Sequence, residues 1–265
     1  MRDLLPANTQ GTAARSSWCS PRQTRRGTCC AHVDKPPDRP DLAIYSQLEQ
    51  YSLGLAPTWN SPDITTNSEI PWTLMPEAFV VVRNLSASAS AINGLVTLST
   101  SPFGIGTPRT QLGAKTISLA PSASISLNFP LTPALLAGEQ SLGFHVDISH
   151  PYDAKPINNR GSQTLKATTT SASGRNISFS FPVANTAAAP RTIDLAVLAS
   201  PFVSTVTPLS HAFAPFEQIT ATLNVTVPAA THGTTASPGY NEITVVGSSG
   251  GQLVDGATHI VFVDD

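Results

Sequence analysis

The sequence predicts an all-β protein in which two tandem immunoglobulin-like antiparallel β-sandwiches follow a disordered N-terminal leader. Short segments in which apolar and polar residues alternate recur along most of the chain, as in half-buried strands. The 265 residues include 23 Pro and 17 Gly, and only 12% are charged. This composition is typical of short strands joined by many turns, and it disfavours a helical bundle. Two sandwiches of about 100 residues each fit the length after the leader is set aside.

Residues 1–40 are the expected leader, because they mix Arg, Ser, Thr, Pro and Cys without apolar periodicity. Such a segment cannot bury enough apolar surface to offset the entropy lost on ordering. Two interpretations stay open: a native tail, or an upstream extension of a protein whose translation starts near Val33. The leader lacks the apolar core of a secretory signal. No run in the sequence approaches the roughly 18 apolar residues of a membrane span.

The first sandwich is expected over residues 41–170. Its start is ambiguous, because Ile44, Leu48 and Tyr51 have helical spacing whereas Leu42 and Ile44 alternate as in a strand. We expect a short extended segment there, followed by a loop. Residues 80–82 are three consecutive valines, which is typical of a central strand covered on both faces. Strands separated by turn residues are predicted at residues 78–82, 95–98, 116–119, 125–129, 142–148 and 162–169.

The second sandwich is expected over residues 171–265, after a small, polar linker at residues 167–174. Apolar and polar residues alternate most regularly from Ile219 to Val227. A run of Gly and Ser at residues 247–251 predicts the turn between the last two strands. The predicted strands are residues 177–183, 193–197, 219–227, 242–246 and 258–263.

The charge distribution argues against nucleic-acid binding. The net charge is −2, but the leader carries seven Lys or Arg and three Asp or Glu, which leaves eight basic and fourteen acidic residues for the rest of the chain. Binding to nucleic acid depends on clustered Lys and Arg that neutralise phosphates. A mildly acidic body without a basic stripe is therefore not expected to bind nucleic acid.

His145, Asp147 and His150 are residue types of a hydrolytic triad, and serines are abundant. No Gly-x-Ser-x-Gly motif is present to expose a serine in a strained turn. We therefore expect His145 and Asp147 to lie on the solvent face of a strand, and we expect the protein not to be an enzyme.

Asp147, Asp153, Asn158 and Asn159 are the candidate metal ligands. Their hard oxygen atoms are of the kind that calcium prefers. The alternative is that the asparagines cap the turn by hydrogen bonds from their side chains to the backbone. Both interpretations stay open, and no other cofactor is predicted.

Phe103 and Ile105 are the candidate contact residues. They lie in the loop at residues 101–107, where an ordinary turn would be polar. An exposed apolar loop marks a surface for another protein. The alternative is that both side chains pack across the end of the sandwich.

Five pieces of the first half, in this order, resemble the bacterial cell-adhesion-related domain family called CARDB: Pro62-Asp63-Ile64, Phe79-Val80-Val81-Val82-Arg83-Asn84, Gly138, Val146-Asp147 and Asn158-Asn159. Three pieces of the second half look like the NEW3 or fibronectin-like modules: Phe181-Pro182-Val183-Ala184-Asn185, Phe213-Ala214-Pro215-Phe216-Glu217-Gln218 and Val227-Pro228-Ala229. The resemblance implies immunoglobulin-like folds and an accessory or adhesive role in surface or secreted proteins.

We therefore expect a non-catalytic structural or adhesive module that contacts a protein partner or a surface assembly, outside the cell or on its surface. One alternative is a carbohydrate-binding accessory domain of a secreted hydrolase. Glycan sites usually display aromatic platforms, and the only tryptophans are Trp18, Trp59 and Trp72. Another alternative is a subunit of an extracellular or virion-like assembly. The sequence leaves the oligomeric state open.

Overall fold

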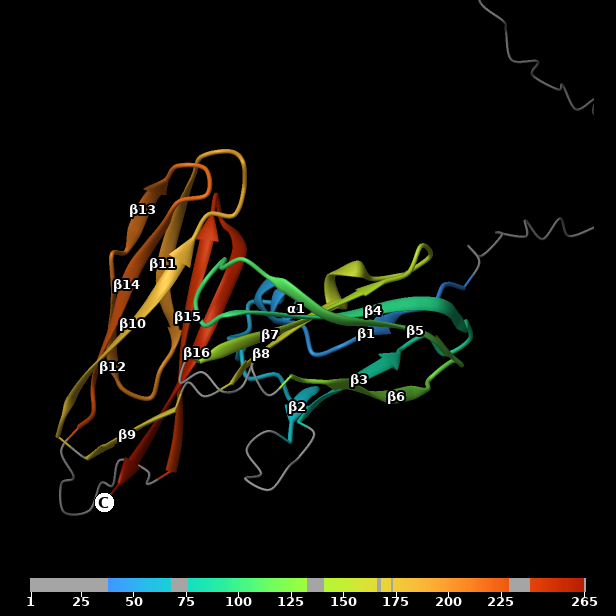
Figure 1. Ribbon diagram of the computed structural model, residues 1–265, viewed down its shortest axis with the longest axis horizontal. Helices are drawn as coiled ribbons and strands as arrows, with labels where there is room; N and C mark the ends of the chain where they lie inside the picture. Colours follow the sequence, from blue (N-terminus) through green and yellow to red (C-terminus); the bar gives the residue numbers. More distant parts are fainter. Residues whose placement is uncertain are drawn as a thin grey trace, which may run out of the picture. The chain divides into compact units, whose positions relative to one another are not determined.

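The computed structural model describes residues 38–67, 76–132, 141–165, 168–172, 174–228 and 239–264. The chain divides into two units, residues 1–37 and residues 38–265, and the fold described below is that of the second unit. The predicted leader therefore lies outside the described residues, apart from residues 38–40. The prediction of an all-β fold is confirmed (Figure 1), since the described helices are two short ones. No helix among the described residues is long and apolar enough to cross a membrane.

Two sheets of four strands each form the first sandwich, and all their ladders are antiparallel. The first sheet is built around β3 (Glu77–Asn84), which pairs with β1 (Leu42–Ala43), β2 (Ile64–Thr66) and β6 (Ser124–Pro130). The second sheet has the order β5 (Thr110–Leu119), β4 (Ala91–Pro102), β7 (Leu142–Ser149) and β8 (Arg160–Leu165). One core of apolar side chains from both sheets joins them.

Alternation along β3 places every second side chain in this core. Val80 and Val82 are buried on one face, whereas Val81 is only half-buried. The prediction that residues 80–82 are covered on both faces is therefore wrong, because the opposite face of this sheet is partly open to solvent. Buried and half-buried side chains alternate along β3, so the two-residue period describes this strand better than its run of three valines does.

The segment after β1 forms a short helix, α1 (Gln47–Ser52), where a loop was predicted. Ser46 is its N-cap, and the Ser46 side chain accepts a hydrogen bond from the backbone N–H of Glu49. The Gln47 side chain is buried and donates to the carbonyl oxygen of Ser162 on β8, over 2.8 Å. The Ser46 cap and the contact of Gln47 with β8 stabilise this helix. The spacing of apolar residues alone therefore did not distinguish the helix from a loop.

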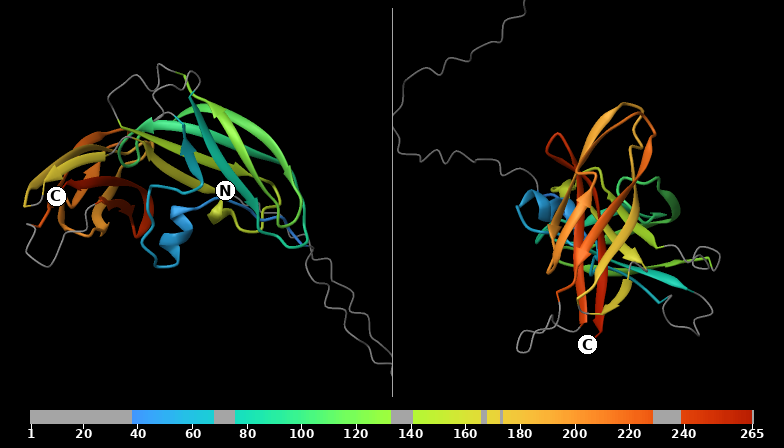
Figure 2. Two further views of the ribbon diagram at one scale, coloured as in Figure 1. Left: turned by 90° about the horizontal axis from the view of Figure 1, so that it is seen from below. Right: turned by 90° about the vertical axis from the view of Figure 1, so that its left-hand side faces the viewer.

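The second sandwich also consists of two sheets around one core. The smaller sheet has the order β10 (Asn176–Ala184), β14 (Gln218–Thr226) and β12 (Val203–Thr207). The larger sheet has the order β13 (Ser210–Phe213), β11 (Arg191–Ala199), β15 (Gly239–Ser249), β16 (Gln252–Asp264) and β9 (Thr168–Ala172). Figure 2 shows β15 and β16 in red, running side by side as their antiparallel register requires. The sequence did not predict β12 and β13, which are short and mostly polar.

The alternation predicted along β14 is confirmed. Ala221, Leu223 and Val225 are buried, and the residues between them are exposed or half-buried. Gly250 and Gly251 form the tight turn between β15 and β16, with φ values of 57° and 77°. This left-handed conformation suits glycine and closes the predicted hairpin.

The strand predicted at residues 162–169 is two strands. β8 ends at Leu165 in the first sandwich, and β9 begins at Thr168 and pairs in parallel with β16 of the second sandwich. The chain therefore passes from one sandwich to the other between these strands, and the boundary predicted after residue 170 falls within β9. A parallel partner distant in sequence leaves no local signal in the residues of β9.

Candidate functional site: a charged pocket where the two sandwiches meet

The loop at residues 103–109 brings the two sandwiches together. The backbone N–H of Ile105 donates to the Pro182 carbonyl over 3.0 Å, and the N–H of Ala184 donates to the Ile105 carbonyl over 2.9 Å. Ile105 thus pairs in parallel with Val183 at the edge of β10. Its side chain is 0% exposed and belongs to the core of the second sandwich. The first sandwich therefore contributes Ile105 to the neighbouring core, and Phe103 packs against the same core.

This burial corrects the prediction of an exposed contact loop. Ile105 is not available to another protein, and Phe103 is half-buried against aromatic rings of the second sandwich. The Phe103 ring lies 4.7 Å from that of His259 and 6.5 Å from that of Phe181, between ring centres. The apolar loop does make a contact, but its partner is the other sandwich of the same chain.

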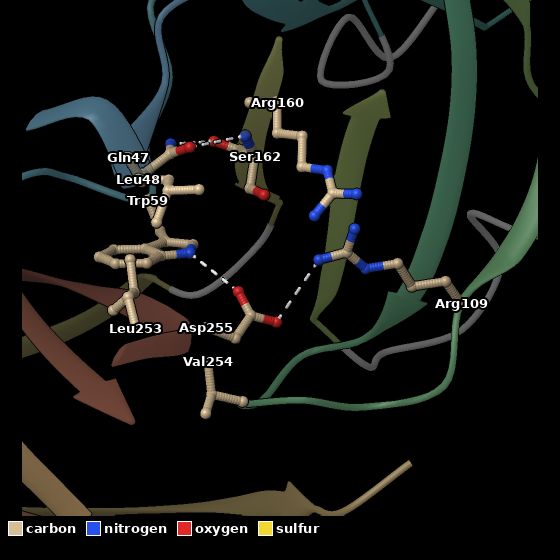
Figure 3. Close-up of a pocket in the computed structure, with 10 residues that line it drawn as sticks. Gln47, Leu48, Trp59, Arg109, Arg160, Ser162, Leu253, Val254 and Asp255 are labelled. Atoms are coloured by element: carbon tan, nitrogen blue, oxygen red, sulfur yellow. Dashed lines mark hydrogen bonds and ion pairs between the residues drawn. The ribbon is translucent and has the colours of Figure 1, made fainter. Parts of the chain in front are cut away.

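Asp255, on β16, links three points of the first sandwich. Its Oδ1 accepts from the indole N–H of Trp59 over 3.0 Å, and its Oδ2 accepts from the N–H of Gly106 over 3.3 Å. Arg109 forms an ion pair with the same carboxylate (Figure 3). Asp255 and Trp59 are both buried, so these bonds fix the junction. The burial of Trp59 also removes it as an aromatic platform for a glycan.

A second set of hydrogen bonds strengthens the junction beside Trp59. Thr58 and Asn60 donate to the two carboxylate oxygens of Glu242 on β15, over 2.7 and 2.8 Å. The N–H of Trp59 donates to the Thr258 hydroxyl over 2.8 Å. Hydrogen bonds to an ionised carboxylate are stronger than those between neutral groups. The two sandwiches are therefore joined by apolar packing and by directed polar contacts.

Two adjoining cavities lie at this junction. The larger has a volume of about 620 Å³ and is lined by three arginines and two aspartates, namely Arg109, Arg160, Arg191, Asp147 and Asp255. The smaller, of about 100 Å³, shares Arg109, Arg160 and Asp255 with it. Figure 3 shows that the guanidinium groups of Arg109 and Arg160 point toward one another. We call the larger cavity the junction pocket.

The arginines of the junction pocket are incompletely paired. The Nε of Arg160 donates to Asp147 over 3.0 Å, whereas Arg109 lies 3.7 Å from Asp147 and 3.8 Å from Asp255. Those two distances exceed the length of a direct hydrogen bond. Within the described part of the chain, the buried Nε of Arg191 has no hydrogen-bond partner. Positive charge thus exceeds negative charge here, and hydrogen-bond donors are left over.

His145 is buried between two serines beside the pocket, whereas a position on the solvent face was predicted. Its Nε2 lies 2.8 Å from Ser101 Oγ, and its Nδ1 lies 3.0 Å from Ser162 Oγ. Burial, and then the positive charge of Arg109, lowers the pKa of His145 to about 4. The imidazole is therefore neutral at pH 7. Both serines lie on the strands that flank β7 in its own sheet, β4 and β8, and no local pattern shows that pairing.

The structure does not assemble the hydrolytic set that the sequence suggested. Ser101 is buried together with His145, so the pair is closed to a substrate. Asp147 pairs with Arg160 and Arg109 in the junction pocket. His150 lies beyond the end of β7 and contacts the carbonyl oxygen of Ile92 over 3.1 Å. Ser101, Asp147 and His150 therefore lie in three different environments.

The candidate calcium ligands lie in two places. Asp147 lines the junction pocket. Asp153 accepts from the backbone N–H groups of Leu42, over 3.0 Å, and Lys155, over 2.8 Å. No group of three or more His, Cys, Asp or Glu side chains in the described residues is placed to hold a metal ion.

The two asparagines follow Asp153 in the same turn, which contains the short helix η1 (Pro156–Asn158). Asn158 donates from its amide to Asp41 over 2.9 Å. The side-chain oxygen atoms of Asn158 and Asn159 are buried and have no hydrogen-bond partner in the described segments. Asp153 thus binds backbone N–H groups, whereas the side-chain amide of Asn158 binds a carboxylate and not the backbone. Turn capping by the two asparagines and calcium binding therefore both stay predictions.

The fold and the pocket define a class: an all-β protein of two joined sandwiches with an arginine-rich pocket between them. The sequence matches no protein-family model and no curated protein. The resemblance to the CARDB and NEW3 families therefore stays a prediction.

Several solved structures are similar to the chain. Red sea bream transglutaminase is 14% identical over 86% of this chain and 31% of its own, with a TM-score of 0.26. The native conformation of Escherichia coli α2-macroglobulin is 12% identical over 76% of this chain and 16% of its own, with a TM-score of 0.29. The CupB6 tip adhesin from Pseudomonas aeruginosa is 9% identical over 86% of this chain and 99% of its own, with a TM-score of 0.25. The chain thus spans less than a third of the first two proteins, and the fold assignment rests on its own sheets and cores.

Proposed function

We propose that this protein is a non-catalytic structural or adhesive β-sandwich module that contacts other proteins outside the cell or on its surface. The observation that carries the proposal is the junction, where Ile105 and Asp255 fix the two sandwiches and leave the junction pocket between them. A fixed body with a preformed pocket loses little freedom on binding, which favours contact with a partner. The buried Ser101–His145 pair supports a structural use of the residues that otherwise suggest hydrolysis.

The contact function is tested with the full chain of residues 1–265. We would immobilise the protein and pass over it the secreted and envelope fractions of its source cells. Each retained protein would then be purified and titrated against the free chain by calorimetry. We expect saturable binding by at least one purified partner. The proposal is wrong if no retained protein binds once purified.

The non-catalytic part needs a separate assay. We would incubate the chain with chromogenic esters, peptides and glycosides and compare it with a Ser101→Ala variant. We expect neither protein to turn over any substrate. Turnover that depends on Ser101 would refute a purely structural role for the Ser101–His145 pair.

Localisation is tested by fractionating the source cells and detecting the protein with an antibody. We expect it in the culture medium or in a fraction that protease reaches in intact cells. Detection in the cytosol alone would remove the extracellular part of the proposal and would leave the contact function to the binding assay.

A further inference from the structure

The junction pocket has the chemistry of a site for an anion. Its walls carry three guanidinium groups and two carboxylates, so one positive charge is in excess. The side chains of Arg109 and Arg160 are 37% and 71% exposed, so an incoming ligand can reach them. A guanidinium group offers a planar pair of N–H donors that matches the two oxygens of a carboxylate.

Two of these arginines retain donors for such a ligand. Among the described residues, the guanidinium group of Arg109 makes no hydrogen bond, and its nearest carboxylate oxygens are 3.7 and 3.8 Å away. Arg191 lines the same pocket, and its buried Nε has no hydrogen-bond partner among the residues that the structure describes. Arg109 comes from the first sandwich and Arg191 from β11 of the second, so the ligand would contact both.

The net charge of the pocket selects among anions. A phosphate group carries about two negative charges near pH 7, so the three arginines attract it and Asp147 and Asp255 repel it about twice as strongly as a single charge. Its desolvation is also costlier, and it would leave the pocket with a net negative charge. A carboxylate carries one negative charge, which the excess positive charge of the pocket balances. Val254 and Pro108 also line the pocket and offer apolar surface to the methylene groups of an acidic side chain.

We propose that the junction pocket binds one carboxylate group of a protein partner through Arg109 and Arg191. This inference rests on the proposed contact function and names the chemistry of the partner. The carboxylate belongs to an acidic side chain or to the C-terminus of the partner. Both sources offer the same planar anion, and two probes distinguish them.

The test is a titration of the full chain followed by NMR of the arginine Nε–H groups and of the Gly106 and Thr107 amides. The probes are N-acetylglutamic acid α-amide for a side chain, N-acetylglycine for a C-terminus and inorganic phosphate. We expect one of the two carboxylates to bind saturably and at least about fivefold more tightly than phosphate. The tighter of the two carboxylates identifies the source.

Three variants assign the binding to the pocket. Arg109→Gln and Arg191→Gln should each weaken carboxylate binding about tenfold, because each removes a charged donor. Arg175→Gln, at an exposed arginine outside the pocket, is the matched control and should bind as the parent protein does. Asp147→Asn removes a repelling charge and should tighten phosphate binding, which a variant that merely misfolds would not do. Unchanged far-ultraviolet circular dichroism would show that the variants are folded.

The proposal is overturned if carboxylates cause no saturable shifts, if phosphate binds as tightly as they do, or if Arg109→Gln binds like Arg175→Gln. Its failure is distinguishable from failure of the contact function. A purified partner that binds the parent, the Arg109→Gln variant and the Arg191→Gln variant equally would refute the carboxylate site and leave the contact function standing. Carboxylate binding without any protein partner would refute the assignment to a protein ligand.

Discussion

Truncation of Ile105 tests whether the two sandwiches form one body. The Ile105 side chain is fully buried in the core of the second sandwich, although the strands that precede and follow its loop, β4 and β5, belong to the first. It is closely packed, since a methyl group added at Gly247 would lie 2.7 Å from Ile105 Cγ2. Replacing a large buried aliphatic side chain by alanine costs about 2–5 kcal/mol of unfolding free energy. We expect about 3 kcal/mol for Ile105→Ala, near the middle of that range.

Urea unfolding of the full chain, followed by circular dichroism, measures this cost. With a slope near 3 kcal/mol per molar urea, a loss of about 3 kcal/mol moves the midpoint down by about 1 M. Ile92→Ala is the matched control, because Ile92 is 58% exposed and its truncation should change stability by less than about 0.5 kcal/mol. If both variants unfold at the same urea concentration, Ile105 does not anchor the second sandwich and the reasoning is refuted.

Three further predictions concern the buried polar groups and the tight contact at Trp59. Burial lowers the pKa of His145 and of His259 to about 4, below the value near 6.5 of an unfolded chain. Protons therefore bind the unfolded state first as the pH falls, and the stability present above pH 6.5 is lost between about pH 6.5 and 4. We expect a loss of about 2 kcal/mol per histidine between pH 7 and 5, measured by urea unfolding, and His259→Leu should lose less than the parent over this range. Gly256→Ala should cost about 1–3 kcal/mol of unfolding free energy, because its new methyl group would lie 2.6 Å from the Trp59 ring. Adding Trp59→Leu to this variant should recover part of the loss. Equal melting temperatures of the parent and both variants would contradict the contact. Asp63→Asn should cost about 2 kcal/mol of unfolding free energy in urea. The buried Asp63 carboxylate accepts from two nitrogens of Arg83, over 2.5 and 2.6 Å, and from the N–H of Tyr45, over 2.7 Å. Equal stability of this variant and the parent would show that these bonds contribute nothing.

The strands were predictable from sequence where alternation is strong. β14 and β7 follow a two-residue period with apolar side chains on the core face, and that period survives in the fold because burial of those side chains dominates folding. The short strands β12 and β13 carry few apolar residues, so their pairing depends on neighbours rather than on their own pattern. Local periodicity therefore identified the strands that form most of each core and missed the short ones that extend a sheet.

The candidate site was not predictable, because its residues come from segments that the sequence keeps far apart. Arg109 precedes β5, Arg160 starts β8, Arg191 starts β11 and Asp255 lies in β16. No spacing relates these residues, and each alone is an ordinary charged residue of a strand or turn. The one local signal was the loop with Phe103 and Ile105, whose apolar side chains were expected to meet a partner.

The loop with Phe103 and Ile105 packs against the second sandwich, and this contact determines the position of the junction pocket. Ile105 inserts into the second core and holds Gly106 and Arg109 beside Asp255. The same insertion carries Arg109 toward Arg191, although the two residues belong to different sandwiches. Ile105→Ala keeps the backbone bonds to Pro182 and Ala184, so it should loosen this loop without separating the sandwiches. Carboxylate binding and stability should therefore both decrease in Ile105→Ala, whereas Arg191→Gln should weaken only the binding, about tenfold.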